Sequence, residues 1–132
     1  MPVAPPRLEL VAQAPAAAGR QLRFRLHMGG ADAILIRLPA EAQASGAGEA
    51  TLVSPRGTGG AGWPFILRCT GRACDGRTFT VTLGSRAPVE WTVAGTRNSV
   101  PPAAAPLLAA RPRFARPQYG ANVTVAVDRF RF

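Results

Sequence analysis

The chain has 132 residues, enough for one domain with a substantial core and too few for two of ordinary size. Its formal net charge is +9, and every basic residue is an arginine. Arginine clusters attract phosphates, nucleic acids and anionic lipid surfaces. The lysine-free composition also fits the residue choice of a GC-rich genome, and we favour that explanation. The sequence has neither the ~20 consecutive apolar residues of a membrane-spanning helix nor the basic-then-apolar order of a signal peptide.

The 14 glycines and 13 prolines predict many turns and short strands. Two stretches alternate strictly between apolar and polar residues, RQLRFRLHM (20–28) and RTFTVTLG (77–84), as half-buried strands do. In chain order, strands are expected at 7–13, 20–28, 33–39, 50–54, 63–69, 77–84, 89–95 and 122–132. These signals predict an all-β fold, a single antiparallel β-sandwich of about eight strands over residues 1–132, with a jelly-roll arrangement as one option. Residues 1–6 are expected to be flexible.

Two segments near the C-terminus depart from the simple strand pattern. The 96–120 segment contains five prolines and predicts an extended, proline-rich crossover over the sheet, with a short helical turn at 103–110. Leu107, Leu108 and Phe114 are its expected anchors. In the last strand, Val123, Val125 and Val127 share one parity, but the phenylalanines that follow have the other. A β-bulge near residues 128 and 129 is therefore expected to turn both sets inward.

The sequence offers few residues for catalysis. The single histidine, His27, lies on the polar face of a strand and is expected to be solvated or hydrogen-bonded. There is no G-x-S-x-G motif and no second cluster of metal ligands. The run GTGGAG (57–62) matches a dinucleotide motif in form, but a strand and not a helix follows it. We therefore predict no catalytic, cofactor-binding or metal-ligating residue in this chain.

Both cysteines lie in the stretch CTGRACDG (69–76), between two predicted strands. The C-x4-C spacing differs from the C-x-x-C of thioredoxin-type sites. A disulfide between Cys69 and Cys74 that staples the turn is the favoured interpretation, and two free thiols are the main alternative. The disulfide would stabilise the fold by about 2 kcal/mol and would indicate an oxidising compartment.

Two pairs of arginines mark a candidate basic surface. Arg23 and Arg25 share one face of their strand, as do Arg129 and Arg131. If the two strands are neighbours, the four side chains would form one stripe able to contact phosphate groups or a membrane surface. Specific recognition of nucleic acid is not expected, because the interleaved aromatic residues have the parity of the core.

The CTGRACDG turn, the run FTVTLGSRAPVEWTVAGTRNSVPPAAAPLLAARP and the A-x-P-Q-x-G and N-V-T-V patterns of the last segment resemble a known family. It is the C-terminal domain of bacterial membrane-anchored zinc exopeptidases of the aminopeptidase Y type, relatives of the vacuolar and endoplasmic-reticulum membrane metallopeptidases. The resemblance covers mainly residues 63–132. It implies a noncatalytic β-sandwich on the periplasmic side of the inner membrane, with zinc held only by a separate catalytic domain of the same protein.

Two functions follow as expectations. The first is a noncatalytic accessory domain that packs on the peptidase domain of its parent chain and shapes substrate access. The second is a free-standing ligand-binding module of the carbohydrate-binding type, suggested by the two tryptophans. Parity assigns Trp91 to the core, so only Trp63 is expected to be available to a ligand.

Overall fold

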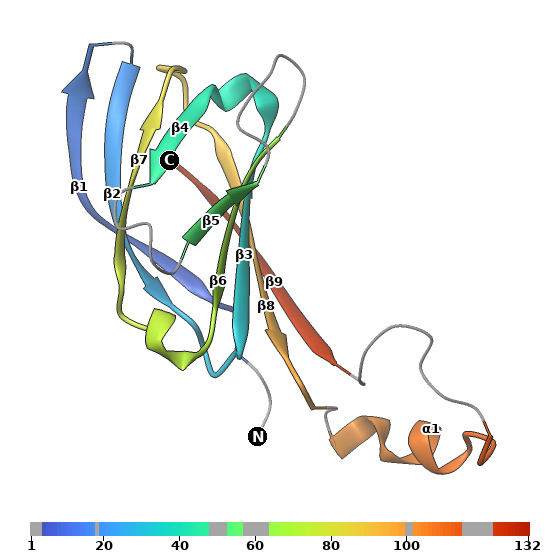
Figure 1. Ribbon diagram of the computed structural model, residues 1–132. Helices are drawn as coiled ribbons and strands as arrows, with labels where there is room; N and C mark the ends of the chain where they lie inside the picture. The colour runs from blue at the N-terminus through green and yellow to red at the C-terminus, as the bar shows by residue number, and fades with distance from the viewer. Residues whose placement is uncertain (1–3, 18, 48–52, 57–63, 100–101, 115–122) are drawn as a thin grey trace.

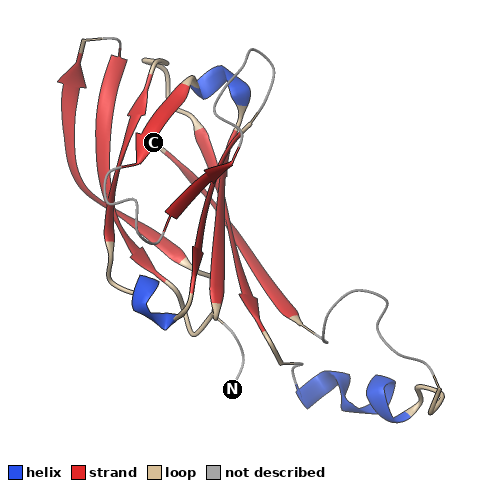
Figure 2. Cartoon of the chain, viewed as in Figure 1, coloured by secondary structure: helices blue, strands red, loops and turns tan. Residues whose placement is uncertain are grey.

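A computed structural model describes residues 4–17, 19–47, 53–56, 64–99, 102–114 and 123–132. They form two antiparallel sheets packed face to face (Figure 1; Figure 2). Sheet A has four strands in the order β1-β2-β7-β4, and sheet B has five in the order β5-β6-β3-β8-β9. The predicted all-β sandwich is confirmed. The jelly-roll arrangement stays a prediction.

The strands of sheet A are β1 (Arg7–Ala16), β2 (Gly19–His27), β7 (Thr78–Leu83) and β4 (Ala44–Ala47). Those of sheet B are β5 (Val53–Arg56), β6 (Phe65–Thr70), β3 (Ala33–Leu38), β8 (Glu90–Arg97) and β9 (Thr124–Arg131). The short helices are η1 (Ala40–Ala42), η2 (Arg72–Cys74), η3 (Pro102–Ala104) and α1 (Ala105–Ala109).

The core is made by alternate residues of the strands, as the period-two pattern predicts. In β2, Leu22, Phe24 and Leu26 are buried while the residues between them are exposed. Trp91 of β8 is fully buried and lies edge-on to Phe24 of the opposite sheet, with ring centroids 5.1 Å apart. Since aromatic rings bury large apolar areas, this contact is a central tie between the two sheets.

The structure of the last strand contradicts the prediction of a β-bulge. β9 pairs with β8 in continuous register from Arg97↔Thr124 to Glu90↔Arg131, so the expected bulge near residues 128 and 129 is absent. Phe130 and Phe132 pack against the core, whereas the valines of opposite parity stay exposed. A bulge would cost ladder hydrogen bonds, and the two large rings fill the inner positions without one. The one irregularity between β1 and β2 lies at Leu10/Ala12.

The structure also contradicts the prediction made for the proline-rich segment. β8 and β9 are adjacent antiparallel strands, so the segment between them joins neighbours in one sheet and is not a crossover. α1 matches the predicted helical turn, but it projects from the sandwich (Figure 1). Leu107 is 76% exposed and Phe114 is 88% exposed, so neither is an anchor on the sheet, and Leu108 is only partly buried. Residues 115–120 of the predicted crossover lie outside the described residues.

The N-terminal segment also packs on the body of the domain. Pro6 is fully buried, and its ring lies against Gly95 of β8. A Cβ at Gly95 would come within 3.3 Å of this ring, so the glycine makes room for the entering chain. Of the stretch expected to be flexible, residues 1–3 lie outside the described part.

Candidate functional site

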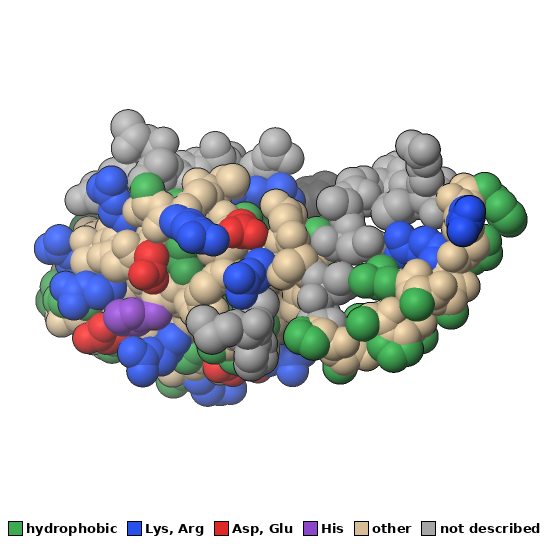
Figure 3. All heavy atoms as spheres, turned by 90° about the horizontal axis from the view of Figure 1, so that it is seen from below, with side chains coloured by type: hydrophobic (Ala, Val, Ile, Leu, Met, Phe, Trp, Pro, Cys, Tyr) green, Lys and Arg blue, Asp and Glu red, His purple; other side chains and the backbone are tan. Residues whose placement is uncertain are grey.

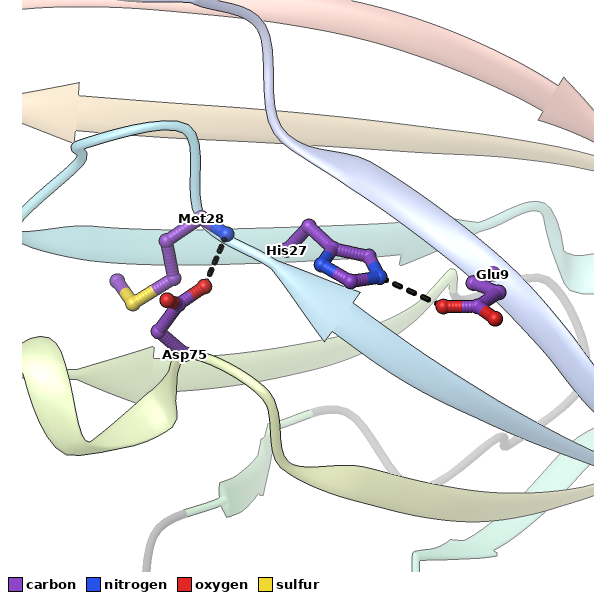
Figure 4. A network of polar contacts seen from close by, with 4 residues as sticks. All are labelled: Glu9, His27, Met28 and Asp75. Atoms are coloured by element: carbon purple, nitrogen blue, oxygen red, sulfur yellow. Dashed lines mark hydrogen bonds and ion pairs between the residues drawn. The ribbon is translucent and has the colours of Figure 1, made fainter.

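The two cysteines form a disulfide that holds the turn between β6 and β7. Cys69 and Cys74 are bonded, with a Cα–Cα distance of 6.0 Å, so the free-thiol alternative is wrong. Cys74 is fully buried in η2. The carboxylate of Asp75 accepts a hydrogen bond from the backbone N–H of Met28 at 2.9 Å, which ties the turn to β2 (Figure 4). This is the geometry of a structural element, because a reactive cysteine needs solvent access.

His27 and Glu9 form a hydrogen-bonded pair on the outer face of sheet A. Nε2 of His27 lies 2.7 Å from Oε2 of Glu9, and a dashed line marks this contact in Figure 4. The hydrogen bond from His27 is the main cause that lowers the pKa of Glu9, and the positive charge of Arg25 adds to it. Both side chains are substantially exposed, so the pair is a surface contact between β1 and β2. The expectation of a hydrogen-bonded histidine is confirmed.

The four arginines of the predicted basic surface do not form one stripe. Arg23 and Arg25 lie on β2 in sheet A, where Arg23 donates to the hydroxyl of Thr78 at 3.3 Å. Arg129 and Arg131 lie on β9 at the edge of sheet B. Because the condition for a shared stripe was that the strands be neighbours, the two pairs are separate surface features.

The surroundings of the second pair are apolar. Val123, Val125 and Val127 are 44%, 54% and 51% exposed along β9 and the residue before it. Register places Val127 beside Ala94 of β8, and Ala94 beside Leu35 of β3. These residues have the parity opposite to that of the buried ones, so they lie on the outer face of sheet B. We call the three valines together with Leu35, Ile66 and Ala94 the valine face.

Charged side chains border the valine face, and most are positive. The next row across sheet B runs from β9 through β8 and β3 to β6. Its residues, in that order, are Arg129, Thr92, Arg37 and Ile66. Arg68 of β6 follows Leu35 in the row of Val127, and Arg131 pairs with Glu90. Arg129 lies 3.8 Å from Glu90 with both groups exposed, which is a weak contact. Among the side chains that the structure describes, Arg37, Arg68, Arg129 and Arg131 therefore border the apolar centre, together with Glu90.

A shallow hollow adjoins the valine face. It has a volume of about 190 Å³ and is lined by Ala33, Ile34, Leu35, Arg68, Thr70 and Thr96. The segment that carries α1 leaves the sandwich beyond Arg97. Hydrophobic side chains of this segment, among them Leu107 and Phe114, are exposed (Figure 3). Exposed apolar side chains that gather on one face and are bordered by charged ones are typical of interaction sites.

The sequence contained the signal for the valine face, although our prediction did not use it. Val123, Val125 and Val127 have one parity and Phe130 and Phe132 the other. Only one set can face the core in an unbroken strand. The larger aromatic rings take that place because they bury more area, and the valines are left outside.

A scan against protein-family models, a search of curated proteins and a search of solved structures each found no match. Within the described ranges, no group of three or more His, Cys, Asp and Glu side chains is placed to hold a metal ion. None of the helices in those ranges is long and apolar enough to cross a membrane.

Proposed function

We propose that this chain is a noncatalytic docking domain that binds a larger protein through the valine face. The observation that carries the proposal is the apolar row Val127–Ala94–Leu35 on the outer face of sheet B, continued by the exposed Val125. Burying such side chains on association is favourable by about 25 cal/mol per Å² of apolar area. The arginines around the row would then set the orientation of the partner.

The charges favour a partner whose complementary surface has an apolar centre and an acidic border. Arg37, Arg68, Arg129 and Arg131 border the row, and in the described part of the chain these positive charges outnumber the negative charge of Glu90 beside them. A basic partner would meet like charges, which costs several kcal/mol in protein interfaces. The surface is thus more selective than an apolar patch alone.

We further propose that the partner is the peptidase domain of the same parent protein, a membrane-anchored zinc exopeptidase of the aminopeptidase Y type on the periplasmic side of the inner membrane. The resemblance of residues 63–132 supports this assignment, and the Cys69–Cys74 disulfide fits an oxidising compartment. In this arrangement the zinc belongs to the catalytic domain, and the present chain shapes access to it.

The carbohydrate-binding alternative has less support. Trp91 is fully buried between Phe24 and Phe132, so it offers no platform for a sugar ring. Trp63 lies outside the described residues. The alternative therefore has no described tryptophan to rest on.

A binding experiment tests the proposal. The peptidase domain encoded in the same reading frame is expressed separately and titrated with the wild-type chain, with Val125→Asp and with Thr80→Asp. Thr80 lies on the outer face of sheet A, so the control adds the same charge away from the valine face. Val125→Asp should weaken binding by about tenfold or more, because it puts a charge into a desolvated apolar contact.

Two results would contradict the proposal. A reading frame with no peptidase domain would remove the proposed partner. Equal loss of binding in Val125→Asp and Thr80→Asp would show that the valine face is not the contact surface.

A further inference from the structure

A second hollow lies at the end of the sandwich, away from the centre of the valine face. Its volume is about 280 Å³, just below the ~300–1,000 Å³ typical of small-molecule sites. It lies between the turn after β2, helix η2 and the last residue of β8. We call it the end pocket, and its lining residues are Met28, Gly30, Ala31, Arg72, Asp75 and Arg97. Figure 3 views the molecule from this end and shows arginine and acidic side chains together there.

Arg97 places a guanidinium group in the end pocket. It continues the inward parity of Trp91, Val93 and Gly95 along β8, so it stands where the core opens at the end of the sandwich. Its side chain is partly buried, and Nη1 would lie 4.0 Å from a Cβ at Gly30. The guanidinium has no hydrogen bond or ion pair with any residue that the structure describes. A partly buried cation without a partner is costly, and an anion bound there would offset the cost.

Arg72 brings a second guanidinium to the same pocket. It begins η2, inside the loop that the Cys69–Cys74 disulfide closes. Its one ion-pair partner in the described ranges is Asp32, at 3.9 Å, and its side chain is 82% exposed. At that distance and exposure the pair contributes little, so Arg72 is free to turn toward a ligand.

One carboxylate oxygen of each of two acidic residues near the pocket already helps to hold its walls. Oδ1 of Asp75 accepts from the N–H of Met28 at 2.9 Å, as Figure 4 shows. Oδ2 of Asp32 accepts from the N–H of Asn98 at 3.0 Å, and its backbone carbonyl accepts from Gly71 at 2.8 Å. The walls are therefore fixed in place by hydrogen bonds and the disulfide. Such preorganisation lowers the ordering cost of binding.

We propose that the end pocket binds a small oxyanion, a carboxylate or phosphate group, on a molecule that also carries a hydroxyl. Arg97 and Arg72 would hold the oxyanion through charge-assisted hydrogen bonds. Oδ2 of Asp75 has no hydrogen bond within the described ranges, so it would accept from the hydroxyl. The apolar floor of Met28 and Ala31, each 2% exposed, would contact the carbon skeleton. This site is independent of the valine face.

Titration of the ¹⁵N-labelled chain tests the proposal, with the amides of Gly30, Ala31 and Gly71 as reporters. Glucuronate supplies a carboxylate beside hydroxyls, glucose 6-phosphate supplies a phosphate, and glucose is the neutral reference. At least one of the two anions should saturate these shifts with a Kd on the order of 1 mM or tighter, and glucose should not. Arg97→Gln should weaken that binding by about tenfold or more, and Arg72→Gln by a smaller factor.

Arg113→Gln, in the exposed segment after α1, is the matched control for the loss of one positive charge. It should leave the affinity unchanged. Saturation by glucose equal to that of the anions, no saturable shift with either anion, or equal loss of affinity in Arg97→Gln and Arg113→Gln would each overturn the proposal. The amide spectra of the variants show whether each is folded.

Discussion

The disulfide gives a stability prediction whose size follows from the chain. Replacing Cys69 and Cys74 by alanine opens a loop with a sequence separation of 5. In the loop-entropy relation, closure of so short a loop restricts the unfolded chain by about 2 kcal/mol at 25 °C. Both sulfur atoms are buried, so their removal adds a packing loss, and about 2 kcal/mol is the lower bound.

Thermal unfolding followed by circular dichroism measures this loss. With an unfolding entropy of about 2.1 cal/mol/K per residue, 132 residues convert 2 kcal/mol into a decrease in Tm of about 7 °C. Wild-type protein in reductant should move in the same direction with no atoms removed, and the double alanine variant should not respond to reductant. A variant that melts within about a degree of wild type would refute the reasoning, because the staple would then contribute nothing.

Two further predictions concern the core and the turns. Trp91→Ala should destabilise the protein by about 3–5 kcal/mol, since it removes the ring between the sheets. Trp91→Phe should cost less than half as much in chemical denaturation, because the buried indole Nε1 has no acceptor in the described ranges and phenylalanine lacks that N–H. Gly19 and Gly71 both have positive φ, at 145° and 99°, so alanine strains the backbone at either. Gly19→Ala should lower Tm more, because its Cβ would also collide with the backbone carbonyl of Leu83, whereas Gly71 faces open space; equal losses would contradict this account.

Much of the sandwich could be predicted because large apolar side chains alternate with polar ones along its strands. The alternation in 20–28 and 77–84 placed Leu22, Phe24, Phe79 and Val81 in the core, and all four are buried. β4 was missed because its sequence, ASGA, has no large apolar residue to show a period. Its place in sheet A depends on pairing with β7, which is a tertiary contact.

The surfaces were harder to predict than the core. Whether Arg23 and Arg129 lie together depends on which strands are neighbours, and strand order is not encoded locally. The end pocket unites Arg72 and Arg97, which are 25 positions apart in the sequence. They are brought together by β3, which pairs with both β6 and β8, and by the hydrogen bonds of Asp32. The disulfide was the exception, because both cysteines lie in one turn.

Hydrogen exchange with and without the peptidase domain tests the docking proposal most directly. Binding through the valine face should slow exchange in β9 and in the neighbouring strands β8 and β3, because bound protein excludes solvent and suppresses local opening. Exchange in β1 and β2 of sheet A should stay as it is in the free chain. Protection confined to sheet A, or no protection in either sheet at saturating partner, would contradict the proposal.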